Sequence, residues 1–217
     1  MTVEVKICGL STPDTMRTAL DAGADYVGLV FFPKSPRNVS LEIATSLADI
    51  ARGRAGIVAL MVDPDDSLVA AVASSVHPDI VQLHGAETPE RCAAIRSAYG
   101  CRIMKVVKVE TAEDAAAALA YRGVADLILF DAKAPKGAAL PGGNGVPFDW
   151  TALDAVKAHV DWMLSGGLTP ENVANAIRLT GAGRVDVSSG IERAPGVKDP
   201  ALIRAFIAAA KGAIEGD

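Results

Sequence analysis

The fold is decided by the stretch Val3-Glu4-Val5-Lys6-Ile7-Cys8-Gly9-Leu10, close to the start of the chain. Apolar residues at its odd positions alternate with Glu4, Lys6 and Cys8, which is the period-two pattern of a β-strand with two different faces. Gly9 interrupts this strand, and Ser11-Thr12-Pro13-Asp14 predicts the start of a helix, with a capping hydroxyl and an early proline. The first element is therefore a strand that passes directly into a helix.

Cys8 ends this strand at the edge where parallel α/β folds bind their ligands. A thiol in that position has access to solvent and substrate. The other interpretation is a small buried hydrophobe, because cysteine is among the most buried residue types. The strand by itself slightly favours the second interpretation.

Composition limits the class of protein. The chain has 217 residues, half of them hydrophobic, which predicts one domain over residues 1–217 with a large core. A net charge of −5, with both signs interspersed, argues against a nucleic-acid-binding face. The longest apolar runs are too short for a membrane span, and Met1 leads into a strand without the pattern of a secretory signal. Three cysteines without metal-type spacing predict free thiols, no metal site and a cytoplasmic location.

The strand-then-helix unit recurs eight times along the chain. Strands are expected at 3–8, 26–31, 55–62, 80–84, 102–107, 127–131, 161–164 and 184–187. Helices are expected at 13–22, 41–51, 67–75, 89–98, 111–121, 148–158, 169–179 and 199–211. Asp25, Asp79 and Asp126 each precede an apolar strand, a weak internal repeat that supports this count.

Continuous apolar strands indicate a parallel sheet buried on both faces, which can be an open doubly wound sheet or a closed barrel. Eight regular units in this length favour a single-domain (β/α)8 TIM barrel. The glycine fingerprint of a dinucleotide-binding fold is also absent after the first strand, where Cys8-Gly9-Leu10-Ser11-Thr12-Pro13 stands instead.

In such a barrel the carboxyl ends of the strands meet at one mouth. The residues that the sequence assigns to this mouth are Cys8, Arg37, Asp63, His84, Asp131, Gly166, Gly167, Ser188, Ser189 and Gly190. The glycine and serine loops after the last two strands predict a phosphate site, because their backbone N–H groups can approach an anion closely. The alternative is that these glycines only make tight turns.

The charged residues of the mouth each allow two interpretations. Asp131 ends an apolar strand, where a carboxyl is costly unless it is paired or used; it can otherwise cap a backbone turn. Arg37 is either a solvated loop cation or a clamp for a carboxylate or phosphate. His84 is equally a structural hydrogen-bonding residue or a catalyst, and Asp63-Pro64-Asp65-Asp66 is interpreted as a helix-capping turn.

Lys6 and Asp186 should both face the barrel interior, on strands that become neighbours when the barrel closes. We expect them to form an ion pair, since neither charge is stable alone when buried.

Several motifs together resemble phosphoribosylanthranilate isomerase. They are Lys6-Ile7-Cys8-Gly9, Phe32-Pro33-Lys34-Ser35-Pro36-Arg37, Gln82-Leu83-His84-Gly85, Phe130-Asp131-Ala132, Gly142-Gly143-Asn144-Gly145, Phe148-Asp149-Trp150, Ser165-Gly166-Gly167-Leu168 and Asp186-Val187-Ser188-Ser189-Gly190-Ile191-Glu192. The resemblance spans the chain in order and implies a (β/α)8 barrel. The chain departs from the family at Asn144, where the family usually has threonine.

The resemblance implies the Amadori rearrangement of N-(5-phosphoribosyl)anthranilate in tryptophan biosynthesis, without a cofactor. It assigns the general base to Cys8 and the general acid to Asp131. It further implies that Arg37 takes the anthranilate carboxylate, and that Gly166, Gly167, Ser188, Ser189 and Gly190 take the phosphate, with His84 and Asp186 among the substrate-binding residues. Lys6 is a candidate for lowering the pKa of Cys8, although pairing with Asp186 would weaken its field. The expected state is a monomer or a homodimer.

Three alternatives remain. An aldolase-type barrel would use Lys105 or Lys133 as a Schiff-base nucleophile, and borohydride trapping would reveal it. A non-catalytic phosphate-sugar-binding barrel would bind ligand without turnover. A related isomerase that also accepts the histidine-pathway analogue typically uses paired aspartates, whereas the first strand here ends in Cys8.

Overall fold

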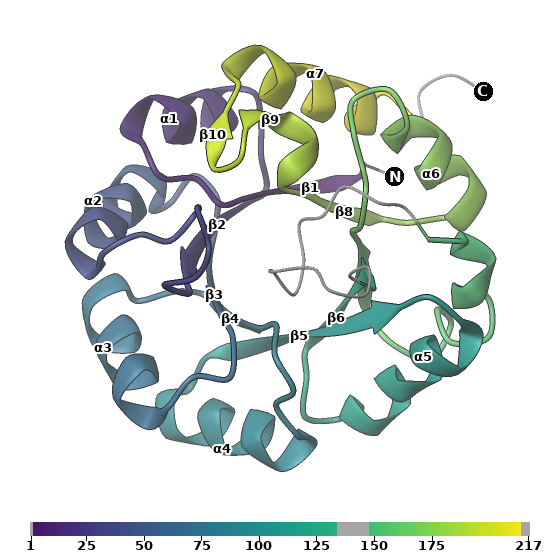
Figure 1. Cartoon of the computed structure of the whole chain (residues 1–217), viewed down its shortest axis with the longest axis horizontal. Helices are drawn as coiled ribbons and strands as arrows, with labels where there is room; N and C mark the ends of the chain where they lie inside the picture. Colours follow the sequence, from purple (N-terminus) through teal and green to yellow (C-terminus); the bar gives the residue numbers. More distant parts are fainter. Residues whose placement is uncertain (1, 134–147, 214–217) are drawn as a thin grey trace.

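Eight parallel strands close into a barrel in a computed structural model that describes residues 2–133 and 148–213. The strands are β1 (Glu4–Cys8), β2 (Tyr26–Phe31), β3 (Gly56–Met61), β4 (Ile80–Leu83), β5 (Arg102–Val109), β6 (Leu127–Ala132), β7 (Trp162–Leu164) and β8 (Arg184–Val187). Each strand pairs with its neighbours in sequence, and β8 pairs back to β1. The predicted (β/α)8 barrel is confirmed (Figure 1).

The helices form a ring around this barrel (Figure 1). They are α1 (Pro13–Asp21), α2 (Leu41–Ala51), α3 (Asp66–Val76), α4 (Pro89–Tyr99), α5 (Ala112–Ala116), α6 (Val173–Thr180) and α7 (Pro200–Lys211). Hydroxyl or carboxyl side chains at the residue before each of α1 to α5 accept a backbone N–H of the first turn, and Asp199 does the same for α7. Within the described ranges, no helix is long and apolar enough to cross a membrane.

The aspartates that precede β2, β4 and β6 connect neighbouring strands at the amino-terminal rim by hydrogen bonds. The Asp25 carboxylate accepts the backbone N–H of Val5 at 2.8 Å, so the residue before β2 is tied to β1. Asp79 accepts from Ile57 of β3 at 2.7 Å in the same way, and Asp126 accepts from Ile103 of β5 at 2.8 Å. The internal repeat in the sequence therefore corresponds to a repeated hydrogen bond between an aspartate side chain and the backbone of the preceding strand.

Side chains of alternating strand residues fill the barrel interior, and the opposite set packs under the helices. The interior cluster comprises Val58, Ile80, Met104, Val106, Leu127, Leu129 and Met163. Nearer the mouth, Cys8 packs with Val30 and Leu60. The barrel is thus a packed core with polar groups at one end.

The segment before β7 differs from the prediction. A helix over 148–158 is wrong: the described residues there form the 3-10 helix η2 (Trp150–Leu153), followed by turns. Leu153 and Val156 are both buried at a spacing of three, which a 3-10 turn places on one side. The helix expected over 111–121 is also divided, into α5 and the 3-10 helix η1 (Ala117–Tyr121).

The structure contains a hairpin after β8 that the sequence does not predict. A 3-10 helix η3 (Ser189–Ile191) leads into β9 (Glu192–Ala194), which pairs with β10 (Val197–Lys198) in antiparallel fashion. Both strands are too short for a periodic pattern to reveal. Figure 1 shows the hairpin close to β1 at the mouth of the barrel.

Candidate active site

The predicted mouth residues all occupy the carboxyl end of the barrel. Cys8 ends β1, Asp131 lies near the end of β6 and Asp186 lies in β8. The others occupy the loops after strands: Arg37 after β2, His84 after β4, Gly166 and Gly167 after β7, and Ser188, Ser189 and Gly190 after β8. The Gly142-Gly143-Asn144-Gly145 motif lies entirely outside the described residues.

The predicted ion pair between Lys6 and Asp186 is confirmed. Lys6 Nζ lies 2.7 Å from Asp186 Oδ1, and the lysine side chain is fully buried. Ser165 Oγ donates to the second carboxylate oxygen, Oδ2, at 3.1 Å. Because β1 and β8 are paired with Lys6 opposite Asp186, barrel closure itself brings these two charges together.

The Cys8 thiol is buried, with 3% of the residue exposed. Burial raises the pKa of this thiol above its ordinary value, because removal from water disfavours the thiolate. The Lys6 ammonium acts to lower the pKa of the thiol, while the Asp186 carboxylate raises it further. Lys6 therefore does not produce a low pKa at Cys8, since burial outweighs its field.

Space for the thiol is provided by Gly28 of β2, a residue that the sequence analysis did not single out. Gly28 pairs with Cys8 in the register of β1 and β2. A methyl group at Gly28 would lie 2.9 Å from Cys8 Sγ and 3.3 Å from Lys6 Nζ. A glycine that is surrounded by apolar strand residues gives no sequence signal of this role, which depends on strand pairing.

Replacing Gly28 by alanine is expected to lower kcat by about tenfold, because it would displace by a fraction of an ångström the thiol that the sequence predicts to be the general base. Steady-state kinetics would measure the change. Gly183→Ala is the matched control, since a methyl group there meets nothing within 4 Å and should leave kcat unchanged. Equal kcat values for the two variants would contradict a tight packing requirement at Cys8.

His84 and Asp131 face each other at the mouth. His84 Nε2 lies 3.3 Å from Asp131 Oδ2, without the alignment of a hydrogen bond, and both side chains are about nine-tenths buried. Asp131 Oδ1 accepts the backbone N–H of Ala132 at 3.0 Å. Lys108 lies opposite Asp131 in the register of β5 and β6. The carboxyl thus retains one oxygen for a proton or a ligand.

The loop that carries His84 is held by two acidic side chains. Glu87 accepts the backbone N–H groups of Asp63 at 2.8 Å and of Gly85 at 3.0 Å. Asp63 accepts from Ala86 at 2.6 Å, so it braces this loop, whereas Asp65 caps α3. The helix-capping interpretation of this turn is therefore confirmed at Asp65, while the Asp63 side chain instead binds the backbone of the loop that carries His84.

Neither lysine of the Schiff-base alternative lies among the mouth residues. Lys105 Nζ forms a buried ion pair with Glu87 at 2.7 Å and donates to Gly85 O at 2.8 Å. Its strand neighbours Met104 and Val106 face the barrel interior, so Lys105 faces outward. Lys133 pairs with Asp114 at 3.3 Å, beside α5.

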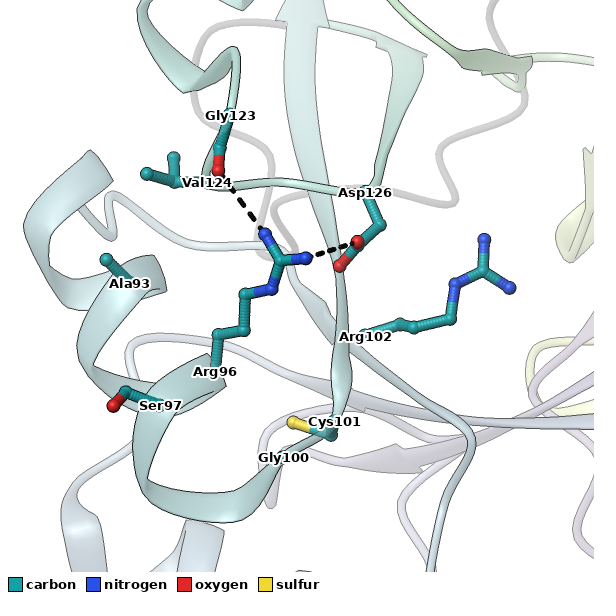
Figure 2. Close-up of a pocket in the computed structure, with 9 residues that line it drawn as sticks. All are labelled: Ala93, Arg96, Ser97, Gly100, Cys101, Arg102, Gly123, Val124 and Asp126. Carbon is teal, nitrogen blue, oxygen red and sulfur yellow. Dashed lines mark hydrogen bonds and ion pairs between the residues drawn. The ribbon is translucent and has the colours of Figure 1, made fainter.

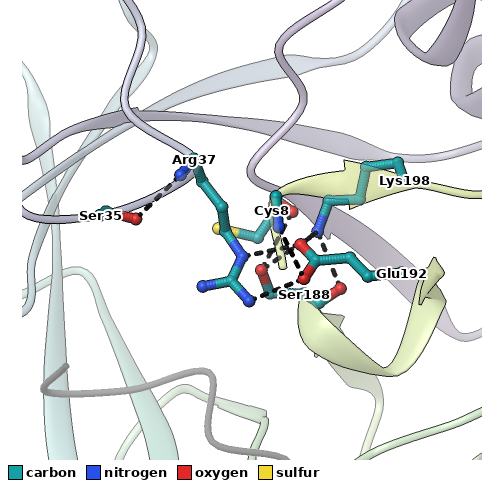
Figure 3. Close-up of polar contacts among 7 residues, drawn as sticks. Cys8, Ser35, Arg37, Ser188, Glu192 and Lys198 are labelled. Carbon is teal, nitrogen blue, oxygen red and sulfur yellow. Dashed lines mark hydrogen bonds and ion pairs between the residues drawn. The ribbon is translucent and has the colours of Figure 1, made fainter. Parts of the chain in front are cut away.

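Arg37 is buried against Glu192 of the hairpin (Figure 3). Its Nε and Nη2 donate to the two carboxylate oxygens of Glu192 at 2.7 and 2.9 Å. Lys198 of β10 also donates to Glu192, at 2.8 Å. Burial acts to raise the pKa of Glu192, but Arg37 and Lys198 outweigh it and hold that pKa below its ordinary value. The sequence singled out Arg37, placed Glu192 only at the end of a family motif without a role, and gave no sign of Lys198.

The two glycine-containing loops after β7 and β8 meet each other. Gly166 and Gly167 have φ angles of 87° and 66°, in the left-handed region that favours glycine. A methyl group at Gly190 would fall 2.0 Å from Leu168 O, so only glycine allows the loops to approach this closely. Ser189 begins η3, whose first N–H groups have no partner inside the helix. The two loops therefore lie against each other, and we call them together the cradle.

A separate surface pocket lies at the opposite, amino-terminal rim, between α4, β5 and β6 (Figure 2). Its main polar groups already bond to one another: Arg96 donates to Asp126 Oδ1 at 3.0 Å and to Gly123 O at 3.3 Å. None of the predicted mouth residues lines this pocket.

The chain is similar to known proteins along almost its whole length. The family model of N-(5'-phosphoribosyl)anthranilate isomerase matches residues 5–209. The isomerase of that name from Paramagnetospirillum magneticum is 58% identical over 98% of this chain and 99% of its own length. That from Rhodopseudomonas palustris is 57% identical over 97% of each chain.

The chain is also similar to solved structures of proteins with this name. Phosphoribosylanthranilate isomerase from Thermotoga maritima superposes with a TM-score of 0.87 at 38% identity, over 97% of this chain and 99% of that one. A phosphoribosylanthranilate isomerase in complex with reduced 1-(o-carboxyphenylamino)-1-deoxyribulose 5-phosphate gives a TM-score of 0.84 at 37% identity, with the same coverage. The chain therefore belongs to the N-(5'-phosphoribosyl)anthranilate isomerase family, enzymes of tryptophan biosynthesis.

Proposed function

We propose that Cys8 and Asp131 are the general base and the general acid with which this isomerase rearranges N-(5'-phosphoribosyl)anthranilate. The observation that carries the assignment is their position: a thiol at the end of β1 and a carboxyl near the end of β6 lie at one rim of the barrel, beside the cradle formed by the last two loops. Because β1 and β6 are three strands apart in the closed barrel, their side chains approach a ligand from different sides.

The first chemical step opens the ribose ring. Asp131 gives its proton to the ring oxygen as the bond from that oxygen to C1′ breaks, which leaves a positively charged Schiff base between C1′ and the anthranilate nitrogen. His84, 3.3 Å from Asp131 Oδ2, is placed to orient this carboxyl and to bond a sugar hydroxyl. Burial of Asp131 favours delivery of the proton to substrate instead of water.

The second step removes the C2′ proton. The Cys8 thiolate takes this proton, the C2′ electron pair forms a double bond to C1′, and the Schiff-base nitrogen becomes neutral. The resulting enolamine tautomerises to the ketone product. Burial that raises the pKa of Cys8 makes its thiolate scarcer but more basic, and the positive Schiff base would favour its formation in the complex.

The remaining residues bind the substrate. Arg37 takes the anthranilate carboxylate through the guanidinium edge that does not face Glu192. The phosphate binds in the cradle of Gly166, Gly167, Ser188, Ser189 and Gly190. Asp186 contributes by holding Lys6 and Ser165 beneath that cradle.

The chain is proposed to act as a monomer or a homodimer, since one solved relative, from Thermotoga maritima, is named as dimeric. Its three free cysteines suit a reducing, cytoplasmic compartment.

Rescue of a tryptophan auxotroph that lacks this isomerisation tests the proposal. The chain is expected to restore growth without tryptophan, and variants that lack the Cys8 thiol or the Asp131 carboxyl are expected not to, at equal protein levels. Growth supported by both variants would remove the assigned acid and base while leaving the family assignment intact.

A further inference from the structure

Three buried charges lie together behind the mouth: Arg37, Glu192 and Lys198, which we call the hairpin cluster (Figure 3). Their side chains are 8%, 4% and 1% exposed, respectively. Two cations share one carboxylate, so the cluster carries a net charge of +1 among the described residues. A buried excess charge is costly unless an opposite charge approaches it, which makes this a place for an anionic group.

The unused donors of the cluster lie on one edge of Arg37. Lys198 has three N–H donors, and these serve Glu192 at 2.8 Å, Ser188 O at 2.8 Å and Ser188 Oγ at 3.2 Å. Arg37 has five N–H donors, of which Nε and one on Nη2 serve Glu192. The outer edge, formed by Nη1 and the second N–H of Nη2, is free among the described residues to donate two hydrogen bonds to a carboxylate.

Contacts on two sides of Arg37 fix the position of its free guanidinium edge. A methyl group at Gly9 would lie 2.8 Å from Arg37 Cδ, so the arginine stem rests directly on the turn after Cys8. The hairpin turn approaches from the other side, where Gly196 donates to Glu192 Oε2 at 3.2 Å and a methyl group on Gly196 would lie 2.5 Å from Pro36 O. The hairpin thus packs on the residue that precedes Arg37.

Lys198 connects the same cluster to the loop after β8. It donates to both oxygens of Ser188, and Ser188 Oγ in turn donates to Cys8 O at 3.3 Å. A displacement of the hairpin would therefore move Arg37 and Ser188 together.

We infer that Glu192 and Lys198 are positioning residues, which hold the free edge of Arg37 toward the anthranilate carboxylate and join it to the phosphate-binding loop at Ser188. The inference rests on the proposed roles of Arg37 and of that loop. Neither residue touches the substrate; each acts through the group that it holds.

Kinetics of Glu192→Gln test the first part. We expect KM for the substrate to rise at least about tenfold with kcat changed less than about threefold, because the arginine contacts a part of the substrate remote from the reacting carbons. A product analogue in which aniline replaces anthranilate, and which lacks the carboxylate, should bind the variant and the wild type equally. Glu4→Gln is the control, since it removes a carboxylate paired with Arg184 at the opposite rim.

Glu192→Gln leaves two cations next to each other and can fold poorly for that reason. The double variant Glu192→Gln with Lys198→Met restores the net charge of the cluster to +1, because Arg37 is then its one remaining charge. This variant is expected to keep the raised KM, and its affinity for the aniline analogue should fall only by the several-fold that Lys198→Met alone causes. A folded double variant with wild-type KM would overturn the inference.

Lys198→Met tests the connection to Ser188. Ribulose 5-phosphate, which has the phosphate but no anthranilate, is expected to bind this variant several-fold more weakly, and Glu192→Gln much as it binds the wild type. Unchanged affinity for Lys198→Met would show that the hairpin does not act on the phosphate loop.

Arg37→Met separates failure of the inference from failure of the proposed function. If Arg37→Met leaves KM unchanged, Arg37 is not the carboxylate clamp and the proposed function is wrong at that residue. If Arg37→Met raises KM but Glu192→Gln and the double variant do not, the clamp stands and the positioning role fails.

Discussion

Cys8→Ala is expected to lower kcat for N-(5'-phosphoribosyl)anthranilate by about 10²- to 10⁴-fold, the usual contribution of a general base. The affinity of the variant for the reduced product, reduced 1-(o-carboxyphenylamino)-1-deoxyribulose 5-phosphate, should stay close to that of the wild type. The thiol is buried against Val30 and Leu60, and its removal leaves the Lys6–Asp186 pair and the glycine loops in place. Steady-state kinetics and calorimetric titration of the reduced product would measure the two quantities separately.

Cys92→Ala is the matched control for this experiment. Cys92 is also a free and fully buried thiol, but it lies on α4, and burial raises its pKa to about 11. Its replacement should lower thermal stability slightly, through the cavity it leaves, and should not change kcat. A Cys8→Ala enzyme as active as Cys92→Ala would exclude the thiol as the base.

Asp131→Asn is expected to lower kcat by a similar factor of about 10² to 10⁴, with little change in KM. The amide keeps the shape of the side chain and can still accept the backbone N–H of Ala132 through its oxygen, but it has no acidic proton for the ring oxygen. Steady-state kinetics over a range of pH would measure the loss, which should persist at every pH.

Asp65→Asn controls for the change of charge. Asp65 caps α3 through the backbone N–H of Leu68, and asparagine caps helices about equally well. Its kcat should equal that of the wild type. Recovery of full activity in Asp131→Asn at low pH would mean that an acid other than Asp131 opens the ring.

Strand positions could be predicted because they depend on local patterns. The alternation around Lys6 and the apolar runs that end at Asp131 and Val187 determine where each strand lies, and eight such units close one barrel. The Lys6–Asp186 contact followed from the same reasoning, since closure makes the first and last strands neighbours.

Other features depend on contacts that no local pattern carries. The role of Gly28 arises from its pairing with Cys8, on a different strand. Glu192 and Lys198 acquire their role only when a short hairpin folds back over the loop of Arg37. The segment after Phe148 has apolar residues at a spacing that suits a helix, but burial of Leu153 and Val156 is achieved by a tighter turn.

The direction of the pKa shift of the Cys8 thiol could not be predicted from the sequence either. Lys6 two residues earlier suggests a stabilised thiolate, yet Asp186 neutralises that lysine and burial raises the pKa of the thiol. The balance between these effects depends on how deeply Cys8 lies in the mouth, which only the folded barrel defines.

The account depends most on transfer of the C2′ proton to Cys8. Its most direct test is the release of deuterium into water from substrate labelled at C2′, compared between the wild type and Cys8→Ala in single-turnover reactions. The wild type is expected to release the label as product forms, and Cys8→Ala is expected to bind the substrate and release none. Release by Cys8→Ala at a rate close to that of the wild type would contradict the account.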